Sequence, residues 1–457
     1  MTFGKQLLFD DLPFTQFEIQ QHIDNGFITS RNGLVTNRGS VQCVRCGNQD
    51  SSWFGVFPCA RCGQTCTYCR KCIMMGRISS CTQLLSWKGP VPILINQEGI
   101  DAKSLLSWSG TLSLGQKQAS SAVAAALLKQ TEILVWAVCG AGKTEVLFEG
   151  INQALVNGLR VCIATPRTDV VLELTPRLKQ AFPTISVASL YGGSPDRHLL
   201  APLTIATTHQ LLRFYQAFDC IIVDEVDAFP YTADDALQYA VRQARKPNSA
   251  LVYLTATPNQ QWQKRCRQGK LSHVKIPARY HRHPLPVPEF QWCGNWNKML
   301  TKNKRLPKNV IQWLERRISS DKQILLFAPK IELLQVLLPI LRAAFPSGKI
   351  ETVHAEDSER KEKVMRMRNH EITLLVTTTI LERGVTFSNL DVAVLGAEDQ
   401  IFTESALVQI AGRVGRKAKH PSGTITFFHF GKTNAMVQAR KQIVQMNNEA
   451  KQLGLLD

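Results

Sequence analysis

The sequence has no long hydrophobic run and comparatively few acidic residues. None of its apolar stretches reaches the roughly 18 consecutive residues that a membrane-spanning helix requires. The first residues, MTFGKQLLFDDLPF, include two aspartates where a cleavable signal peptide needs an apolar segment. We therefore expect a protein that stays in the cytoplasm.

The charge balance is strongly basic. The 457 residues include 36 acidic and 54 basic side chains, which gives a formal net charge of +18. Apolar residues (44%) and charged residues (20%) stand near the averages of folded proteins, which excludes wholesale disorder. A basic surplus of this size favours a polyanionic partner such as nucleic acid. At about 100 to 200 residues per domain, the length predicts two or three domains.

From residue 132 onward, short apolar runs alternate with helix-length segments. The first block contains EILVWAV, RVCIAT, LTIAT, CIIVD and LVYLTAT, and the second contains KQILLFA, ITLLVTT, DVAVLG and TITFFHF. This alternation predicts two α/β domains built on parallel sheets. Between the blocks, IPARYHRHPLPVPEF holds four prolines, which oppose both a helix and a central strand. We place the domain boundary there.

A phosphate-binding loop follows the first apolar run. The segment AVCGAGKTE matches the P-loop pattern except that Ala137 stands in the place of the first glycine. Lys143 is expected to neutralise the β- and γ-phosphates of ATP, and Thr144 to place its hydroxyl on Mg²⁺. Backbone amides at a helix N-terminus favour anions, so the phosphates are expected to rest on Gly140, Ala141 and Gly142.

A P-loop needs an acidic partner at the end of a neighbouring strand, and the run CIIVDEVD supplies it. Asp224 is predicted to hold Mg²⁺, and Glu225 to orient and deprotonate the attacking water. Together the two motifs predict an enzyme that hydrolyses ATP.

Cysteine is concentrated in one segment, because eight of the thirteen lie between residues 43 and 81. In a reducing compartment such clustering indicates metal binding rather than disulfides. Two residues between cysteines let both sulfurs reach one tetrahedral Zn²⁺, and this spacing recurs along the segment. We expect a zinc site formed by Cys43, Cys46, Cys69 and Cys72.

The remaining cysteines of this segment leave the number of zinc ions open. Cys59 and Cys62 are predicted as further ligands. The segment then holds either one site with spare thiols or two sites, the second of which recruits Cys66 or Cys81.

The motifs together resemble those of superfamily 2 nucleic-acid helicases and translocases. The resemblance rests on DEVD, on TAT at residues 255–257 and on QIAGRVGR at residues 409–416. It implies two RecA-like domains with ATP in the cleft between them and Gln409 among the nucleotide contacts. Arg413 and Arg416 would then reach the γ-phosphate as arginine fingers.

The same resemblance implies contacts to adenine and to a nucleic-acid strand. LSLGQ ends in Gln116, which would read adenine. ATPR, TTHQ and TTTILERG occupy the places where such enzymes hold the phosphates of a strand. The residues expected to make these contacts are Arg167, Thr207, Thr208, Thr379 and Arg383.

Two segments resemble the ComFA family, the late-competence ATPases of transformable Gram-positive bacteria. They are YCRKCIMMGR at residues 68–77 and RYHRHPLPVP at residues 279–288. The resemblance implies a motor on the inner face of the membrane that uses ATP to draw single-stranded DNA into the cell. It also implies a ComFC-type companion, a DprA-type loader and a membrane DNA channel protein as partners, and it leaves a homo-oligomer open.

These observations combine into one expected architecture: α/β, with two tandem RecA-like parallel-sheet domains preceded by a small zinc-binding module. The expected parts are an N-terminal arm at 1–42, the zinc module at 43–85, an ATP-binding domain at 86–282 and a helicase C-terminal domain at 283–457.

Three other functions share some of these features. A PriA-like replication-restart helicase has the same core but carries its zinc cysteines within the second helicase domain, whereas here they precede the motor. The boxes differ only modestly from those of RNA helicases, so an RNA helicase stays an alternative. A zinc-dependent docking protein with a vestigial motor conflicts with the intact P-loop and DEVD box.

Overall fold

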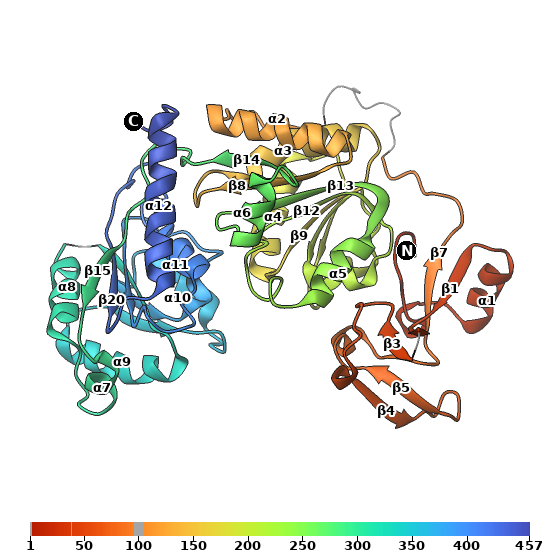
Figure 1. Ribbon diagram of the computed structural model, residues 1–457, viewed down its shortest axis with the longest axis horizontal. Helices are drawn as coiled ribbons and strands as arrows, with labels where there is room; N and C mark the ends of the chain where they lie inside the picture. The colour runs from red at the N-terminus through yellow and green to blue at the C-terminus, as the bar shows by residue number, and fades with distance from the viewer. Residues whose placement is uncertain (1, 38, 96–104, 321) are drawn as a thin grey trace. The chain divides into compact units, whose positions relative to one another are not determined.

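The computed structural model describes residues 2–37, 39–95, 105–320 and 322–457 (Figure 1). The chain divides into two compact units. The first comprises Met1–Leu112, Lys117–Val135 and Thr144–Val274, and the second comprises Ser113–Gln116, Trp136–Lys143 and Lys275–Asp457. Among the described residues, no helix is both long enough and apolar enough to cross a bilayer.

Residues 2–37 and 39–43 form ordered structure rather than the N-terminal arm expected at 1–42. They contain the 3₁₀ turn Phe9–Asp11, helix α1 (Gln16–Asp24) and the strands β1 (Ile28–Asn32), β2 (Leu34–Asn37) and β3 (Ser40–Cys43). A capping box of Thr15 and Glu18 starts α1. Strand β1 pairs antiparallel with β7 (Gln83–Trp87), so the segment gains its order from residues some fifty positions later. Local periodicity cannot reveal such pairing.

The cysteine-rich segment consists of short antiparallel strands and tight turns. Strands β2 and β3 form a hairpin, and β4 (Phe54–Pro58), β5 (Thr65–Cys69) and β6 (Ile78–Ser79) form a three-stranded sheet. The 3₁₀ turns Ser51–Trp53 and Ile73–Met75 connect these strands. Sheets this small bury little apolar surface, so further links are needed to stabilise them.

A seven-stranded sheet forms the core of the first α/β domain, with the strand order β10-β11-β9-β12-β13-β8-β14. Strands β9 and β11 are buried along their whole length, as parallel strands covered on both faces should be. In chain order the strands are β8 (Glu132–Ala137), β9 (Val161–Thr165), β10 (Val187–Leu190), β11 (Leu203–Thr207), β12 (Phe218–Val223), β13 (Arg245–Thr255) and β14 (Ser272–Ile276).

Helices cover the faces of this sheet. Figure 1 shows α2 and α3 next to each other, and a β-carbon on Gly150 of α3 would contact Val123 and Leu127 of α2. The helices are α2 (Leu114–Leu128), α3 (Lys143–Val156), α4 (Thr168–Ala181), α5 (Asp235–Ala244) and α6 (Gln260–Arg267), with 3₁₀ turns at Pro195–His198 and Thr208–Arg213.

A second sheet of six strands has the order β15-β20-β19-β16-β18-β17, and its neighbouring strands are parallel. Its strands are β15 (Glu289–Trp292), β16 (Gln323–Phe327), β17 (Ile350–Val353), β18 (Leu374–Thr377), β19 (Leu390–Leu395) and β20 (Ile425–His429). The two parallel sheets with helices on their faces confirm the predicted fold class.

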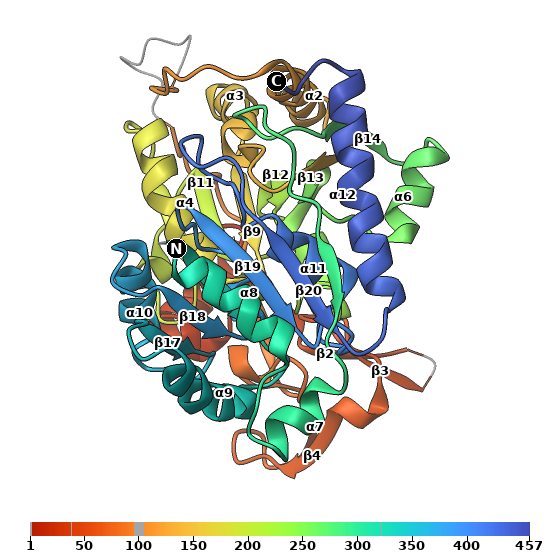
Figure 2. The same ribbon diagram turned by 90° about the vertical axis from the view of Figure 1, so that its left-hand side faces the viewer.

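Helices α8 and α9 pack on strands β16 to β18, and α11 packs against α12 (Figure 2). Helix α12 buries residues at helical spacing, from Met436 to Ala450. The helical segments are α7 (Trp296–Thr301), α8 (Lys308–Ile318), α9 (Ile331–Ala344), α10 (Arg360–Arg368), the 3₁₀ turn Thr379–Leu381, α11 (Glu404–Ala411) and α12 (Asn434–Gln452).

Candidate functional site

The P-loop lies between strand β8 and helix α3. Ala137 is the last residue of β8 and fully buried, so the position of the first glycine is a strand residue here and tolerates a side chain. Gly140 and Gly142 have φ angles of +83° and +69°, which favour glycine. Lys143 and Thr144 open the 14-residue helix α3, where the helix dipole and free N–H groups attract phosphate.

The side chain of Gln116 braces this loop. Its Nε2 donates to the carbonyl oxygen of Ala141 at 2.9 Å, and its Oε1 accepts from the backbone N–H of Ser113 at 2.8 Å. Gln116 is only 2% exposed. Both ends of the amide are therefore engaged by the protein itself, and the glutamine predicted to read adenine holds the P-loop in shape.

The DEVD box follows strand β12, the central strand of the first sheet. Asp224 and Glu225 are half-buried at the strand's carboxyl end, and the backbone N–H of Glu225 donates to Asp224 Oδ1 at 2.8 Å. Glu225 has a φ of +55°, a conformation that costs a non-glycine residue free energy and that recurs at functional sites. Strand β13 lies between β12 and β8 in the sheet.

Asp227, the last residue of the box, ties DEVD to the TAT segment at the end of β13. Its Oδ1 accepts from the hydroxyl of Thr255 at 2.7 Å and its Oδ2 from the hydroxyl of Thr257 at 2.5 Å. The Thr257 N–H also donates to Thr255 Oγ1 at 2.9 Å. Two neighbouring strand ends are thus joined through one carboxylate. Asp227 was not among the predicted site residues, although it is the last residue of the DEVD motif.

The QIAGRVGR segment lies at the end of α11, within the second unit. Arg413 is 2% exposed, and its guanidinium donates to the carbonyl oxygens of Glu382, at 2.6 and 2.8 Å, and of Val385. Arg416 is half-buried and contacts Thr386 Oγ1 at 3.4 Å. The two predicted arginine fingers therefore differ. Arg413 makes short hydrogen bonds to backbone carbonyl oxygens, whereas the contacts of Arg416 are longer.

The second unit also contains the P-loop residue Cys139, which contacts this segment. Its Sγ lies 3.1 Å from Oε1 of Gln409, and a β-carbon on Gly412 would lie 2.6 Å from the same sulfur. Real β-carbons do not approach so closely. Gly412 therefore has to be a glycine for this contact to form.

Arg279 is a residue of this region that was not predicted to have a role in the site. It is 1% exposed and donates to the carbonyl oxygens of Gly415 at 2.6 Å and Gly412 at 3.3 Å. Its side chain also lies where a β-carbon on Gly140 would touch it. Burial lowers the pKa of Arg279 to about 10, which still leaves it charged at neutral pH. The run RYHRHP, which begins with Arg279, could have drawn attention to this residue. The local sequence does not show where the arginine side chain packs.

The five residues predicted to hold nucleic acid differ in exposure. Arg167, at the start of α4, and Thr379 are half-buried. Thr207, Thr208 and Arg383 are 6%, 0% and 3% exposed. The Arg383 guanidinium donates to Ser405 Oγ at 3.0 Å. Arg167 and Thr379 are therefore more exposed than the other three side chains.

Four buried cysteines in the N-terminal module form a candidate zinc site. The Sγ atoms of Cys43 and Cys72 lie 3.8 Å apart, those of Cys46 and Cys69 lie 3.6 Å apart, and all four lie within 4.8 Å of one another. We call this group the inner cluster. Four convergent thiols are the donor set that Zn²⁺ takes in structural sites, so the residues fit the ion.

A buried arginine supports the inner cluster. Arg45 is 2% exposed and donates to the Sγ of Cys72 at 3.1 Å. It also donates to the carbonyl oxygens of Cys72, Met75 and Gly76, at 2.7, 2.8 and 2.5 Å. A cation beside the sulfur offsets the negative charge of a zinc-thiolate group.

The predicted ligands Cys59 and Cys62 lie outside the inner cluster. They converge with Cys66 and Cys81 in a second group, which we call the outer cluster. The structure therefore separates the eight cysteines of the segment into two sets of four.

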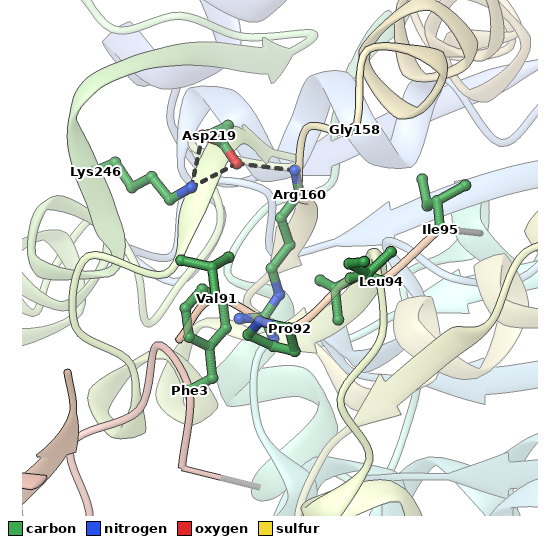
Figure 3. A pocket seen from close by; sticks show the side chains of 10 residues that line it. Phe3, Val91, Pro92, Leu94, Ile95, Gly158, Arg160, Asp219 and Lys246 are labelled. Carbon is green, nitrogen blue, oxygen red and sulfur yellow. Dashed lines mark hydrogen bonds and ion pairs between the residues drawn. The ribbon is translucent and has the colours of Figure 1, made fainter. Parts of the chain in front are cut away.

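A cavity of about 410 Å³ in the first unit involves none of the predicted site residues (Figure 3). Its lining combines the apolar segment 91–95 with charged residues. Asp219 accepts from Lys246 Nζ at 2.8 and 3.0 Å and from the Arg160 backbone N–H at 2.9 Å. The carboxylate is thus neutralised within the protein.

Comparisons with known proteins agree with this arrangement. The family model of the competence protein ComFA N-terminal domain matches residues 1–86. The models of the DEAD/DEAH box helicase and of the helicase conserved C-terminal domain match residues 116–265 and 302–418.

Two relatives extend over nearly the whole chain. The competence protein ComFA of Bacillus subtilis (strain 168) is 49% identical over 99% of this chain and 96% of its own length. The competence protein ComFA of Streptococcus pneumoniae is 40% identical over 90% of this chain and 92% of its own length. Among solved structures, the DEAD-box helicase Mss116 bound to ssRNA and UDP-BeF aligns with a TM-score of 0.55 at 18% identity, over 70% of both chains, and this likeness concerns the fold.

Proposed function

Since the chain belongs to the ComFA family of competence proteins, we propose that it is an ATP-driven translocase that moves single-stranded DNA during uptake. It is a nucleic-acid-dependent ATPase of the superfamily 2 helicase class, and its helicase domains imply ATP and Mg²⁺. The observation that carries the proposal is the joining of this motor to a ComFA-type N-terminal module in one chain.

We propose that the P-loop and DEVD box form the hydrolytic site. Lys143 would contact the β- and γ-phosphates at the N-terminus of α3, and the Thr144 hydroxyl and Asp224 would hold Mg²⁺. Glu225 would orient the attacking water and take its proton. Mg²⁺, when bound, neutralises phosphate charge. The half-buried position of both carboxylates at the end of β12 supports these roles.

The two arginines of QIAGRVGR receive different roles in this proposal. Arg416 is the better arginine finger, because it would give up only long contacts of 3.3 and 3.4 Å to reach a phosphate. Arg413 would first have to leave the carbonyl oxygens of Glu382 and Val385. Gln409 is proposed as a further nucleotide contact, whereas Gln116 supports the site indirectly by holding the P-loop.

In each sheet, residues at the carboxyl ends of the strands are proposed to contact the phosphates of the DNA strand. Arg167 and Thr379 are half-buried and would offer side chains to its phosphates. Thr207, Thr208 and Arg383 are buried, so any phosphate contact there would use backbone N–H groups. The net charge of +18 would add attraction without base preference.

Zinc in the inner cluster would fold the N-terminal module, because its small sheets cannot stabilise themselves alone. The proposed partners, from family membership, are a ComFC-type companion, a DprA-type loader and a membrane DNA channel protein. The proposed place of action is the inner face of the cell membrane. The PriA-like alternative is disfavoured because the cysteine clusters lie ahead of the motor.

The test is steady-state ATPase activity without polymer and with single-stranded DNA, duplex DNA or single-stranded RNA. The wild type is compared with Lys143→Ala and with Lys129→Ala, which removes an equal charge from an exposed position outside the motifs. We expect stimulation by single-stranded DNA in the wild type and in Lys129→Ala, and none in Lys143→Ala. Stimulation by RNA or duplex that equals or exceeds that by single-stranded DNA would refute the substrate, and hydrolysis by Lys143→Ala would refute the site.

A further inference from the structure

The outer cluster consists of four cysteines that come from three separate pieces of the N-terminal module. Cys59 and Cys62 lie in the turn between β4 and β5, Cys66 lies on β5, and Cys81 follows β6. The Sγ atoms of Cys59 and Cys81 lie 3.6 Å apart, those of Cys62 and Cys66 lie 3.4 Å apart, and all four lie within 4.8 Å of one another.

These distances have the dimensions of a zinc-thiolate tetrahedron. Four sulfurs at about 2.3 Å from one Zn²⁺ lie about 3.8 Å from each other. A disulfide would bring two sulfurs to about 2.05 Å. The spacing in the outer cluster agrees with that in the inner cluster, where the paired sulfurs lie 3.6 and 3.8 Å apart.

The backbone of the outer cluster repeats the turn of the inner one. The sequences are CVRCGN at residues 43–48 and CARCGQ at residues 59–64. In each, the glycine N–H donates to the carbonyl of the first cysteine, at 2.8 Å for Gly47 and 2.9 Å for Gly63. Both glycines have positive φ, of 73° and 68°. In each, the first cysteine's N–H donates to the carbonyl five residues later at 2.9 Å. The same turn therefore aims two sulfurs at one point in both places.

Strand β5 supplies one ligand to each cluster. Cys66 and Cys69 are three residues apart on this strand, and side chains three apart on a strand point to opposite faces. One face thus presents Cys66 to the outer cluster and the other presents Cys69 to the inner cluster. The CxxC spacing at this point therefore does not mark a shared metal.

We propose that the N-terminal module holds a second structural Zn²⁺, bound by Cys59, Cys62, Cys66 and Cys81, in addition to one in the inner cluster. The ion links the β4–β5 turn to the segment after β6, where Ser80 N–H already donates to Thr67 O at 2.9 Å. A divalent ion with a preference for four thiolates is the ligand class that this set of donors takes.

The two sites differ in protection. All four cysteines of the inner cluster are buried, whereas Cys62 is exposed and Cys81 is partly exposed. Arg45 of the first turn is buried against its cluster, but its counterpart Arg61 points outward to Asp10, at 3.0 Å, with 56% of its side chain exposed. The outer Zn²⁺ should therefore be the first to leave for a chelator.

The first test is metal content of the full-length chain by elemental analysis. We expect two Zn²⁺ per wild-type chain and one per Cys62→Ser/Cys81→Ser chain. Cys266→Ala, a buried cysteine outside both clusters, is the matched control and should keep two. One Zn²⁺ in the wild type, or two in the double variant, would overturn the proposal.

A second measurement uses only the wild type and does not depend on folding of the variant. The protein is treated briefly with a zinc chelator, free thiols are alkylated, and mass spectrometry locates the label. We expect one Zn²⁺ to leave first, with label on the outer cysteines, while the inner cysteines stay protected. Labelling of the outer cysteines before any Zn²⁺ is released would contradict a metal there. Neither measurement depends on ATP hydrolysis, so the proposal stands or falls separately from the proposed function.

Discussion

Replacing Arg45 with alanine should weaken zinc binding in the inner cluster and destabilise the N-terminal module. The guanidinium makes three hydrogen bonds to carbonyl oxygens and one to the Cys72 sulfur. At about 1 kcal/mol for each carbonyl contact and about 2 kcal/mol for the contact to a charged sulfur, the loss is about 3 to 5 kcal/mol. Loss of a group that supports a metal ligand typically costs about 10- to 100-fold in metal affinity.

The assay is competition with a chromophoric chelator, together with alkylation of the cysteines to tell the two clusters apart. The matched control is Arg61→Ala, at the same position of the repeated turn. Both partners of the ion pair between Arg61 and Asp10 are exposed to solvent, so its loss should lower the free energy of unfolding by only about 0 to 1 kcal/mol. The affinity of the inner cluster for zinc should stay unchanged. Zinc binding by Arg45→Ala within twofold of wild type, or equal weakening of zinc binding in both variants, would contradict this role of Arg45.

Three further predictions concern the motor and the fold. Asp227→Ala removes the carboxylate that accepts hydrogen bonds from the Thr255 and Thr257 hydroxyls at 2.7 and 2.5 Å. We expect kcat for stimulated ATP hydrolysis to fall by about tenfold or more while equilibrium ATP binding persists. An unchanged kcat would contradict this expectation. Gly412→Ala should abolish ATPase activity because its β-carbon would overlap the P-loop cysteine, and Gly431→Ala, with open space around it, should not; equal activities would show that the contact is dispensable. Burial and nearby guanidinium groups lower the pKa of Lys5 from 10.5 to about 8, so the folded state releases a proton that the unfolded chain retains, and this contribution to stability rises with pH between those values. The melting temperature should therefore rise between about pH 8 and pH 10, and it should rise more in wild type than in Lys5→Met. An equal rise in both proteins would contradict a lowered pKa of Lys5.

The strands that could be predicted from sequence are those that are buried on both faces. The run CIIVD predicted β12 because a central parallel strand is apolar throughout. Strands β14 and β17, which contain polar residues such as His273 and Glu351, give no such signal. The order of the strands in each sheet depends on pairing between distant segments, and local pattern does not contain it.

The cysteines show a similar limit. Spacing predicted that zinc would be bound and identified the inner cluster, but it could not divide the remaining thiols. That division depends on which face of β5 each sulfur occupies, and on β6 bringing Cys81 back beside the β4–β5 turn. Strand β1 was missed for the same reason, because it forms by pairing with β7 some fifty residues later.

The motif residues were predicted better than their surroundings. The P-loop and DEVD box lie at strand ends, as expected from their order in the sequence. The burial of Arg413, Thr208 and Arg383 was not predicted. A motif gives the type and position of a residue, but it does not show which other side chains pack against it. Arg279 shows the converse: it opens the run RYHRHPLPVP, but only the structure shows that its side chain packs against Gly140 of the P-loop.

We propose that ATP hydrolysis moves the protein along single-stranded DNA, and the time at which the protein arrives at a strand end measures this movement. A fluorophore at one end of single strands of increasing length reports arrival after ATP is added to pre-bound protein. We predict an arrival time that grows in proportion to strand length, requires ATP and is absent in Lys143→Ala. An arrival time independent of length, with ATP hydrolysis intact, would contradict translocation.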